Sequence, residues 1–506
     1  MTLASLAPSI RHVKKIGLCR TAFVLPILCA ASVVAASGQT FVNIANFKGP
    51  NGGFPSYMAP VQGRDGDIYG TTAGFSTDNG TVFRVRPPDV FRNLRITPEG
   101  IPNAGLILGA DGDLYGTTAA GGGIGPCYLG CGTVFKISAG SVLTVLHRFA
   151  GYPSDGAIPD AVLIQAADGN FYGTTSEGGN TQCQDQAGCG TIFKMTPRGQ
   201  VVILHNFTRA DGASPYAGLV QTADGTFYGT TAQGGSHKIC VPLGCGTVFK
   251  MTAKGVLTTL HNFNFSDGSY PISGLVQSAD GDFYGVTAGG GSSGNGTFFR
   301  ITSGGTLTTL HNFDLADGSS PTGSLILATD GNFYGTTQYG GKAPCPLGCG
   351  TVFRVTPCGD VTTLHYFVAT DGELPEGGLL QATDGSFYGS TFWGGDLSCN
   401  VGAGCGTVFS ISLGLPRFVA LVRTAGEARQ QFGILGQGFI GASTVLLNGT
   451  PARFSVRSAT LILATVPPGA TTGHVTVITP SGTLSSNVPF HVTQSLGARR
   501  RPVPDD

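Results

Sequence analysis

Residues 211–263 decide the fold, and they read DGASPYAGLVQTADGTFYGTTAQGGSHKICVPLGCGTVFKMTAKGVLTTLHNF. Short runs of apolar, aromatic and β-branched residues alternate with glycine-rich turns. This pattern predicts four strands, at residues 217–221, 226–231, 246–252 and 256–263. The Asp224-Gly225 pair between the first two strands predicts a type I′ hairpin turn, because Asp-Gly suits the positive φ angles of that turn.

The same unit recurs along the chain. The phrase Asp-Gly-x-[Ile/Leu/Phe]-Tyr-Gly occurs seven times, with its aspartates at Asp65, Asp111, Asp168, Asp224, Asp280, Asp330 and Asp384. Four short antiparallel strands in a unit of about 50 residues are typical of a β-propeller blade. The seventh unit lacks its fourth strand, whereas residues 41–47 match that strand. The sequence therefore predicts an all-β, seven-bladed β-propeller closed by an N-terminal strand, with an open arc as the alternative.

The repeat resembles a known family. Gly-Leu-Val-x-x-x-Asp-Gly-x-Phe-Tyr-Gly-Thr-Thr, followed by Gly-Gly, Gly-Thr-Val-Phe-Lys and Leu-His-x-Phe, is similar to the GloVer tandem repeat of secreted bacterial proteins, whose C-terminal anchors vary in type. The resemblance covers about residues 40–413. It implies export and a repeat fold, and it brings no established activity.

The C-terminal part resembles a different module. Gly436-Gln437-Gly438-Phe439, Ala464-Thr465-Val466-Pro467 and Gly473-His474-Val475-Thr476-Val477 are similar to the TIG/IPT immunoglobulin-like domain. The resemblance implies an immunoglobulin-like β-sandwich that acts as a spacer or an interaction module. We expect it to span residues 414–493, after a propeller at residues 39–413 and before a polar tail at residues 494–506.

Residues 1–38 are expected to be a signal peptide, with an uncleaved anchor as the alternative. Arg11, Lys14, Lys15 and Arg20 precede an apolar stretch at residues 21–34, and small residues follow it. The mature chain is then expected to lack a transmembrane span and to be secreted, periplasmic or at the cell surface.

Cysteine usage fits that compartment. Ten cysteines form close pairs between the second and third strands of their units: Cys127/Cys131, Cys183/Cys189, Cys240/Cys245, Cys345/Cys349 and Cys399/Cys405. Each loop offers two thiols and no histidine between them, which favours disulfides over zinc ligands. Once Cys19 and Cys29 are assigned to the signal peptide, Cys358 is left over. We expect it to be a free thiol, with an intermolecular bridge as the alternative.

The composition argues against several classes of function. The chain has 29 basic and 29 acidic residues, so nucleic acid is not expected as a partner. Five histidines occupy one repeat position on the predicted fourth strand: His147, His205, His261, His311 and His365. One histidine per blade cannot share a metal with the next, so we interpret them as repeated structural hydrogen bonds. No catalytic motif, metal site or cofactor is predicted.

A variable repeat position is the best binding clue. Two residues after the Thr-Thr step, the units carry Gly74, Ala120, Glu177, Gln233, Gly289, Tyr339 and Trp393. We take Trp393, Tyr339, Glu177 and Gln233 as candidate binding residues. Tyr339 and Trp393 belong to neighbouring units and are expected to form an aromatic platform for a sugar ring. The alternative is that both rings pack between blades.

Three functions stay open. The first is a secreted or cell-surface binding or scaffold protein that recognises a polysaccharide or a protein through the loop face of the propeller. The second is an extracellular polysaccharide-cleaving enzyme with acids at the mouth of the central channel, for which Glu177, Glu373 and Glu376 are non-repeated acids. The third is a purely structural envelope protein.

Overall fold

The computed structural model describes residues 38–493, apart from 50–51, 75–79, 88–89, 97–99, 180–182, 184–186, 236–238 and 343–344. In this part the chain is built of strands, with a single 3-10 turn, η1 (Asn400–Gly402). The expected signal peptide, up to residue 37, and the expected tail lie outside the described residues. Within the described ranges no helix has the length and apolarity needed to cross a membrane.

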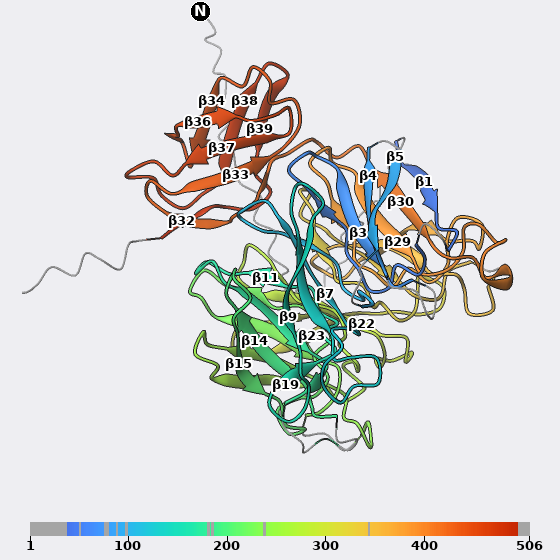
Figure 1. Ribbon diagram of the computed structural model, residues 1–506. Coiled ribbons are helices and arrows are strands. Elements are labelled where there is room, and N and C mark those ends of the chain that lie inside the picture. The colour runs from blue at the N-terminus through green and yellow to red at the C-terminus, as the bar shows by residue number, and fades with distance from the viewer. Residues whose placement is uncertain are drawn as a thin grey trace, which may run out of the picture. The chain divides into compact units, whose positions relative to one another are not determined.

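Seven four-stranded antiparallel sheets follow one another between Thr40 and Ser412 (Figure 1). The first three contain β2 (Val61–Gln62), β3 (Ile68–Thr72), β4 (Thr81–Arg86) and β5 (Val90–Ile96); β6 (Ile107–Leu108), β7 (Leu114–Thr118), β8 (Thr133–Ile137) and β9 (Leu143–Arg148); and β11 (Ile164–Gln165), β12 (Phe171–Thr175), β14 (Thr191–Met195) and β15 (Val201–Asn206). A small pair, β10 (Gly156–Ala157) and β13 (Glu177–Gly178), accompanies the third.

The next three sheets contain β16 (Val220–Gln221), β17 (Phe227–Thr231), β18 (Thr247–Met251) and β19 (Leu257–Asn262); β20 (Val276–Gln277), β21 (Phe283–Thr287), β22 (Thr297–Ile301) and β23 (Leu307–Asn312); and β24 (Ile326–Leu327), β25 (Phe333–Thr337), β26 (Thr351–Val355) and β27 (Val361–Tyr366). The prediction of an all-β chain with repeated four-stranded units is confirmed.

The last of these sheets takes one strand from the other end of the repeats. It contains β28 (Leu380–Gln381), β29 (Phe387–Thr391), β30 (Thr407–Ser412) and β1 (Thr40–Asn46). β1 pairs antiparallel with β30, so Thr40 lies opposite Ser412. The ring of Phe41 also stacks on His365 of the preceding sheet, with 3.7 Å between ring centroids.

The repeated phrase has a physical basis in hydrogen bonds. In five of the seven repeats the tyrosine hydroxyl donates to the turn aspartate, as from Tyr115 to Asp111 at 2.7 Å. The second threonine of the Thr-Thr step shares a hydrogen bond with the threonine that begins the third strand, as between Thr231 and Thr247 at 2.8 Å. The first bond ties the second strand to the turn before it, and the second bond ties the second strand to the third.

Side chains pack each sheet against the next one. The tyrosine of one repeat lies against the phenylalanine that begins the second strand of the following repeat, as in Tyr228 and Phe283 with centroids 4.1 Å apart. The glycine after the tyrosine makes room for a buried ring, because a Cβ at Gly229 would lie 2.6 Å from Phe249. The core is therefore a series of clusters between consecutive sheets.

The expected type I′ turn is wrong. Only Gly225 of the Asp224-Gly225 pair has a positive φ, at 85°, and its N–H donates to the carbonyl of Thr222 at 2.9 Å. The Thr222 N–H in turn donates to Thr226, so the turn holds three residues rather than two. Asp224 keeps an ordinary backbone and its carboxylate accepts the N–H of Thr226.

The structure contains the five disulfides Cys127–Cys131, Cys183–Cys189, Cys240–Cys245, Cys345–Cys349 and Cys399–Cys405. The expectation of a free thiol at Cys358 is wrong, because this residue is also disulfide-bonded. That expectation came from the cysteines after Cys29, since all of them except Cys358 belong to the five close pairs.

The C-terminal strands form an immunoglobulin-like sandwich. One sheet contains β31 (Ala420–Leu421), β33 (Gln431–Leu435), β37 (Leu461–Thr465) and β36 (Phe454–Val456), and the other contains β35 (Thr450–Pro451), β34 (Thr444–Leu447), β38 (Val475–Thr479) and β39 (Gly482–Ser485). β32 (Ala425–Glu427) pairs parallel with β40 (His491–Thr493). Buried Ile434, Val445, Ile462 and Val477 join the two sheets in one core.

Candidate functional site

The four candidate residues occupy equivalent places. Each lies just after the second strand of its sheet, and its backbone pairs with the Asp-Gly-x-x-Pro turn that opens the same repeat. The backbone pairs are Ala157 with Glu177, Ala213 with Gln233, Ser319 with Tyr339, and Glu373 with Trp393. The opening turns and the variable position therefore lie at the same end of the sheets.

The repeated histidines lie elsewhere and have a structural role. Each Nε2 is hydrogen-bonded to the aspartate of the opening turn, as between His205 and Asp211 at 3.1 Å. The same carboxylate accepts the N–H of Thr208 at 2.8 Å. Among the residues that the structure describes, no group of three or more His, Cys, Asp or Glu side chains is arranged to hold a metal ion.

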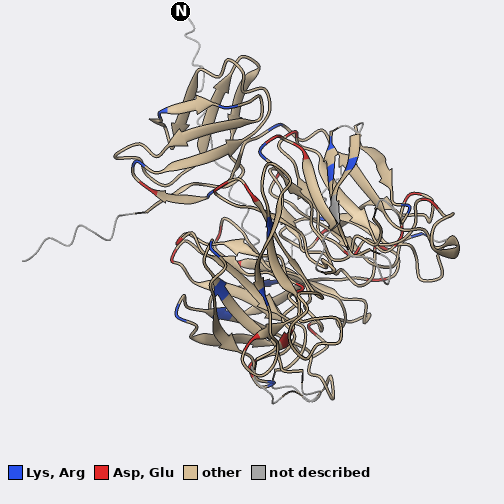
Figure 2. Ribbon diagram, viewed as in Figure 1, with Lys and Arg blue, Asp and Glu red and all other residues tan. Residues whose placement is uncertain are grey.

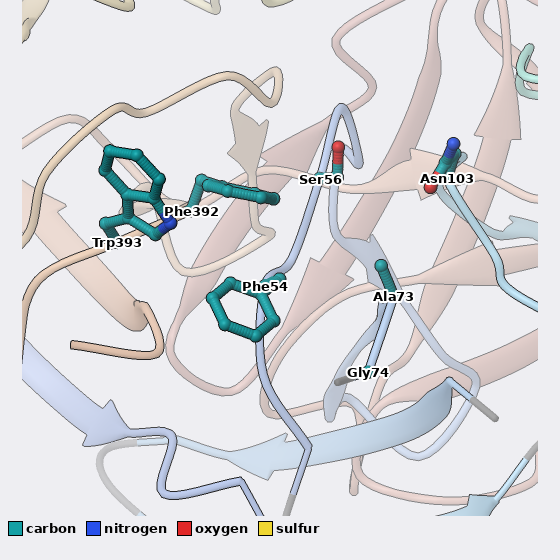
Figure 3. A pocket seen from close by; sticks show the side chains of 7 residues that line it. All are labelled: Phe54, Ser56, Ala73, Gly74, Asn103, Phe392 and Trp393. Atoms are coloured by element: carbon teal, nitrogen blue, oxygen red, sulfur yellow. The ribbon is translucent and has the colours of Figure 1, made fainter. Parts of the chain in front are cut away.

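Trp393 lines a cavity of about 490 Å³ between the last repeat and the first two. The cavity is lined by Phe54, Ser56, Ala73, Gly74, Asn103, Phe392 and Trp393, and Figure 3 shows the three aromatic side chains together with Ser56 and Asn103. The ring centroids of Phe54 and Phe392 are 5.2 Å apart, and those of Phe392 and Trp393 are 5.7 Å apart. The cavity thus combines an aromatic wall with two uncharged polar groups.

The expected pairing of Tyr339 with Trp393 is not what the structure builds. In the described part of the chain no ring contact joins the two side chains, and Tyr339 does not line the cavity. The aromatic partners of the tryptophan come instead from Phe392, its neighbour in sequence, and through it from Phe54 of the first repeat. Glu177 and Gln233 do not line the cavity either.

A carboxyl group lies behind each polar residue of the cavity, and it belongs to Glu376, which is buried, or to Asp160, which is partly buried. Ser56 Oγ donates to Glu376 at 3.3 Å, and Gln338 donates to the other oxygen of Glu376 at 2.8 Å. Burial raises the pKa of Glu376 to about 7, although these two hydrogen bonds act in the opposite direction. At neutral pH this carboxyl is therefore close to half-protonated.

The second carboxyl belongs to Asp160. Asn103 Nδ2 donates to one of its oxygens at 3.2 Å, and Ser176 Oγ donates to the other at 3.0 Å. Burial raises the pKa of Asp160 to about 6; the two hydrogen bonds lower it, and the nearby charge of Glu177 raises it further. Glu376 does not shift the pKa of Asp160, and Asp160 does not shift the pKa of Glu376. The two carboxyl groups therefore titrate separately.

Tyr57 breaks the repeat beside these groups. Four residues lie between Pro102 of the opening turn and Ile107 of the first strand in the second repeat, whereas the first repeat has one more, Tyr57. Its φ is 45° and its side chain is 47% exposed. Burial of its hydroxyl raises its pKa, and so do charges on its neighbours, which are Glu376, Tyr216, Asp160 and Tyr339.

Sequence reasoning missed the residue that follows the proline of each opening turn. In chain order this position carries Ser56, Asn103, Asp160, Tyr216, Ile272, Thr322 and Glu376. The residue type at this position differs among the seven repeats, whereas the proline before it and the first strand after it recur. This variation was as clear a signal as the variation at the position of Trp393. The two variable positions meet at the cavity, where Ser56 and Asn103 face Trp393 (Figure 3).

Charges are sparse around the repeats. Figure 2 shows Lys and Arg residues spread over several sheets, with acidic residues between them. Each of the lysines and arginines whose pKa is raised has an aspartate partner, as Lys136 has Asp113 at 2.9 Å. None of the seven residues that line the cavity is charged.

The comparisons with known proteins identify the repeats. The Gloeobacter/Verrucomicrobia repeat matches residues 32–241 and again residues 241–437. The chain belongs to the Gloeobacter/Verrucomicrobia repeat family. At the C-terminal end of these repeats in the sequence, the IPT/TIG domain matches residues 416–492. The resemblances to the GloVer repeat and to the TIG/IPT module are both confirmed.

Several solved structures are similar in fold to this Gloeobacter/Verrucomicrobia repeat protein. A streptogramin B lyase is 14% identical, covers 74% of this chain and 98% of its own, and has a TM-score of 0.49. A virginiamycin B lyase from Staphylococcus aureus is 12% identical over 74% and 98% of the two chains, with a TM-score of 0.44. A fungal alcohol oxidase is 13% identical over 90% and 99%, with a TM-score of 0.49. No curated protein matches the chain.

Proposed function

We propose that this family member is a secreted carbohydrate-binding protein, in which a closed seven-bladed propeller holds a sugar residue in the cavity beside Trp393. The observation that carries the proposal is the composition of the cavity. Aromatic rings of Phe54, Phe392 and Trp393 stand near the hydroxyl of Ser56 and the amide of Asn103. A sugar ring stacks its apolar face on such a wall and forms hydrogen bonds with its edge.

Contacts between the last and first repeats support the closure. The Thr329 N–H donates to Gln381 of the next repeat at 3.0 Å, and the Thr383 N–H donates to Gln62 at the same distance. Tyr388 shares a core cluster with Ile68, which occupies the position where five of the other repeats have a phenylalanine. The last repeat therefore contacts the first as consecutive repeats contact each other. The proposed domains are a signal peptide (1–38), the propeller (39–413), the TIG/IPT domain (414–493) and a tail (494–506).

Several features support a location outside the cytoplasm. Five disulfides close loops that lie within 4 to 6 residues of sequence, and such bonds persist in oxidising compartments. The basic and apolar N-terminal segment adds to this argument. We place the protein in the periplasm, at the cell surface or in the medium, where polysaccharides are available as ligands. A protein ligand is the alternative for the same cavity.

An extracellular polysaccharide-cleaving enzyme is the second candidate. Two carboxyl groups with pKa values of about 6 and 7, Asp160 and Glu376, favour it, because acid catalysis uses carboxyl groups that stay protonated near neutral pH. Two observations weigh against it. Neither group lines the cavity, and neither shifts the pKa of the other, whereas glycosidases hold two carboxyls across one bond. The third candidate is a purely structural role in the envelope, and that role would not explain the cavity.

The test is a glycan-binding screen on the chain from Gly38 onward, with the solution also analysed for released sugars. We expect binding without release. Trp393→Ala should weaken binding by about 2- to 12-fold, because stacking on an aromatic ring contributes about 0.5–1.5 kcal/mol beyond the buried area. Tyr339→Ala is the matched control, since it removes an aromatic ring at the equivalent position outside the cavity, and it should leave binding unchanged.

Release of oligosaccharides would favour the enzyme over the binding protein. If Trp393→Ala and Tyr339→Ala weakened glycan binding equally, the cavity would not be the binding site, since Trp393 lines it and Tyr339 does not. Thermal unfolding of both variants checks that the fold is retained, because both side chains are partly exposed.

A further inference from the structure

When Glu376 and Asp160 are ionised, they fix the hydrogen-bond direction of the two polar groups of the cavity. An ionised carboxylate only accepts hydrogen bonds. Glu376 then accepts the hydrogen bond of the Ser56 hydroxyl, and Asp160 accepts one N–H of the Asn103 amide. The groups left for a ligand are the lone pairs of Ser56 Oγ, the Oδ1 oxygen of Asn103 and the second N–H of its amide, so acceptors predominate. A ligand in this cavity meets its best partners by donating hydrogen bonds.

We infer that the cavity takes an uncharged sugar residue that donates hydroxyl protons to Ser56 and Asn103, and that Glu376 and Asp160 are positioning residues that exclude acidic glycans. This inference rests on the proposed carbohydrate binding and gives its ligand class. A hydroxyl group donates and accepts, so a neutral sugar satisfies both residues. A glycan carboxylate or sulfate only accepts, so it can use neither Ser56 Oγ nor Asn103 Oδ1.

The charges around the two carboxyl groups act in the same direction. Glu376 faces Ser56 and Gln338 through hydrogen bonds, and Tyr57 lies within its electrostatic reach. Asp160 faces Asn103 and Ser176, with Glu177 and Tyr216 nearby. The backbone of Glu373 pairs with Trp393, and burial raises the pKa of its carboxyl.

Among the described residues, no lysine or arginine lines the cavity or shifts the pKa of Glu376 or Asp160. When both carboxyls are ionised, this side of the cavity is therefore negative. Specificity then has two sources, which are acceptor atoms that an anion cannot use and a like-charge repulsion. Both act against the acidic sugar rather than for the neutral one.

The experiment compares matched ligands. The neutral probes are cellulose, xylan, mannan and 1,3-glucan oligosaccharides, and each neutral probe that has primary alcohols is also tested after their oxidation to carboxylates. Pectate and alginate oligomers are added as natural acidic probes. At about pH 8, where both carboxyls are ionised, we expect the oxidised form to bind at least about tenfold more weakly than its neutral parent.

The pH dependence separates positioning from a merely structural role. At about pH 5 both carboxyls are mainly protonated, so Glu376 can donate to Ser56 and the repulsion falls; the discrimination should then shrink severalfold. In Glu376→Gln the amide can also donate to Ser56, so the variant should show the weaker discrimination at both pH values. Asp160→Asn is the second, independent variant, and Glu427→Gln, at an exposed residue of β32 in the TIG/IPT domain, is the matched control.

Each outcome decides something different. Weaker binding of the oxidised glycans that disappears in Glu376→Gln or Asp160→Asn supports the inference. Equal binding of neutral and oxidised glycans, or discrimination that both variants retain, overturns it and leaves carbohydrate binding intact. If none of the neutral or acidic probes binds, the proposed function itself fails.

Discussion

The closure of the propeller can be tested at one buried glutamine. Gln62, 6% exposed, accepts the N–H of Thr383 at 3.0 Å and donates to the carbonyl of Gly66 at 3.0 Å. Thr383 is 1% exposed, so the substitution Gln62→Ala leaves a buried N–H without its acceptor. Such a group costs about 1–3 kcal/mol. We therefore expect Gln62→Ala to destabilise the contact between the first and last repeats by this amount.

Amide hydrogen exchange measures the effect where it occurs. If the protecting contact opens locally, a loss of about 1–3 kcal/mol speeds exchange of the Thr383 amide by about 5- to 150-fold. Gln221→Ala is the matched control within the row of repeats, because Gln221 accepts the N–H of Ala167 at 3.0 Å in the same way. Ala167 is exposed, so its amide should respond by less than that of Thr383.

An open arc predicts a different result. The Gln62–Thr383 bond would then not exist in solution, and the Thr383 amide would exchange rapidly in the wild-type chain and in Gln62→Ala alike. If the Ala167 amide still responded to Gln221→Ala, the contact between consecutive repeats would stand and the closure would be refuted.

Two further predictions concern the repeat itself. Gly229→Ala should destabilise the protein by about 1–3 kcal/mol in chemical denaturation, because the new Cβ would lie 2.6 Å from the Phe249 ring; unchanged stability would show that the ring can shift aside. Burial opposes ionisation of Asp211, but hydrogen bonds from His205 and a backbone N–H hold its pKa below the ordinary value. This stabilisation is complete above about pH 4 and is lost as the pH falls through the folded-state pKa, so His205→Ala should destabilise at neutral pH and approach the wild type in acid.

Local chemistry allowed the sequence to predict most of the repeat. The third strand, expected at residues 246–252, is Thr247–Met251, because its alternating side chains and flanking glycines leave little choice. The first strand was expected at residues 217–221 but is only Val220–Gln221. The carbonyl of Ala217 instead accepts a hydrogen bond from Thr174 of the preceding repeat, and this partner is far away in sequence.

The candidate site was harder to predict for the same reason. Variation at Trp393 pointed to the correct end of the sheets, and this residue does line the cavity. Its aromatic partner was expected from the neighbouring Tyr339, yet Phe54 comes from the first repeat. Contacts between the first and last repeats depend on the angle between consecutive sheets. A local sequence pattern does not predict that angle.

The carboxyl groups show a second limit. Glu376 was noticed as a non-repeated acid, but nothing in the sequence indicated that Ser56 would lie 3.3 Å from it. Asp160 was not singled out, because it shares its neighbourhood with many turn aspartates. Which of these acids is buried depends on the packing of three repeats, so the raised pKa of each could be found only from the structure.

The pairing of β1 with β30 has a consequence for biogenesis. β1 leaves the ribosome long before β30 and finds its partner only when the last repeat has followed it. Until then β1 exposes an unpaired edge, and the last sheet cannot be completed, so final folding is expected after synthesis of the last repeat rather than during it. A chain truncated within its last repeat should thus leave β1 unpaired and be an easy substrate for proteases.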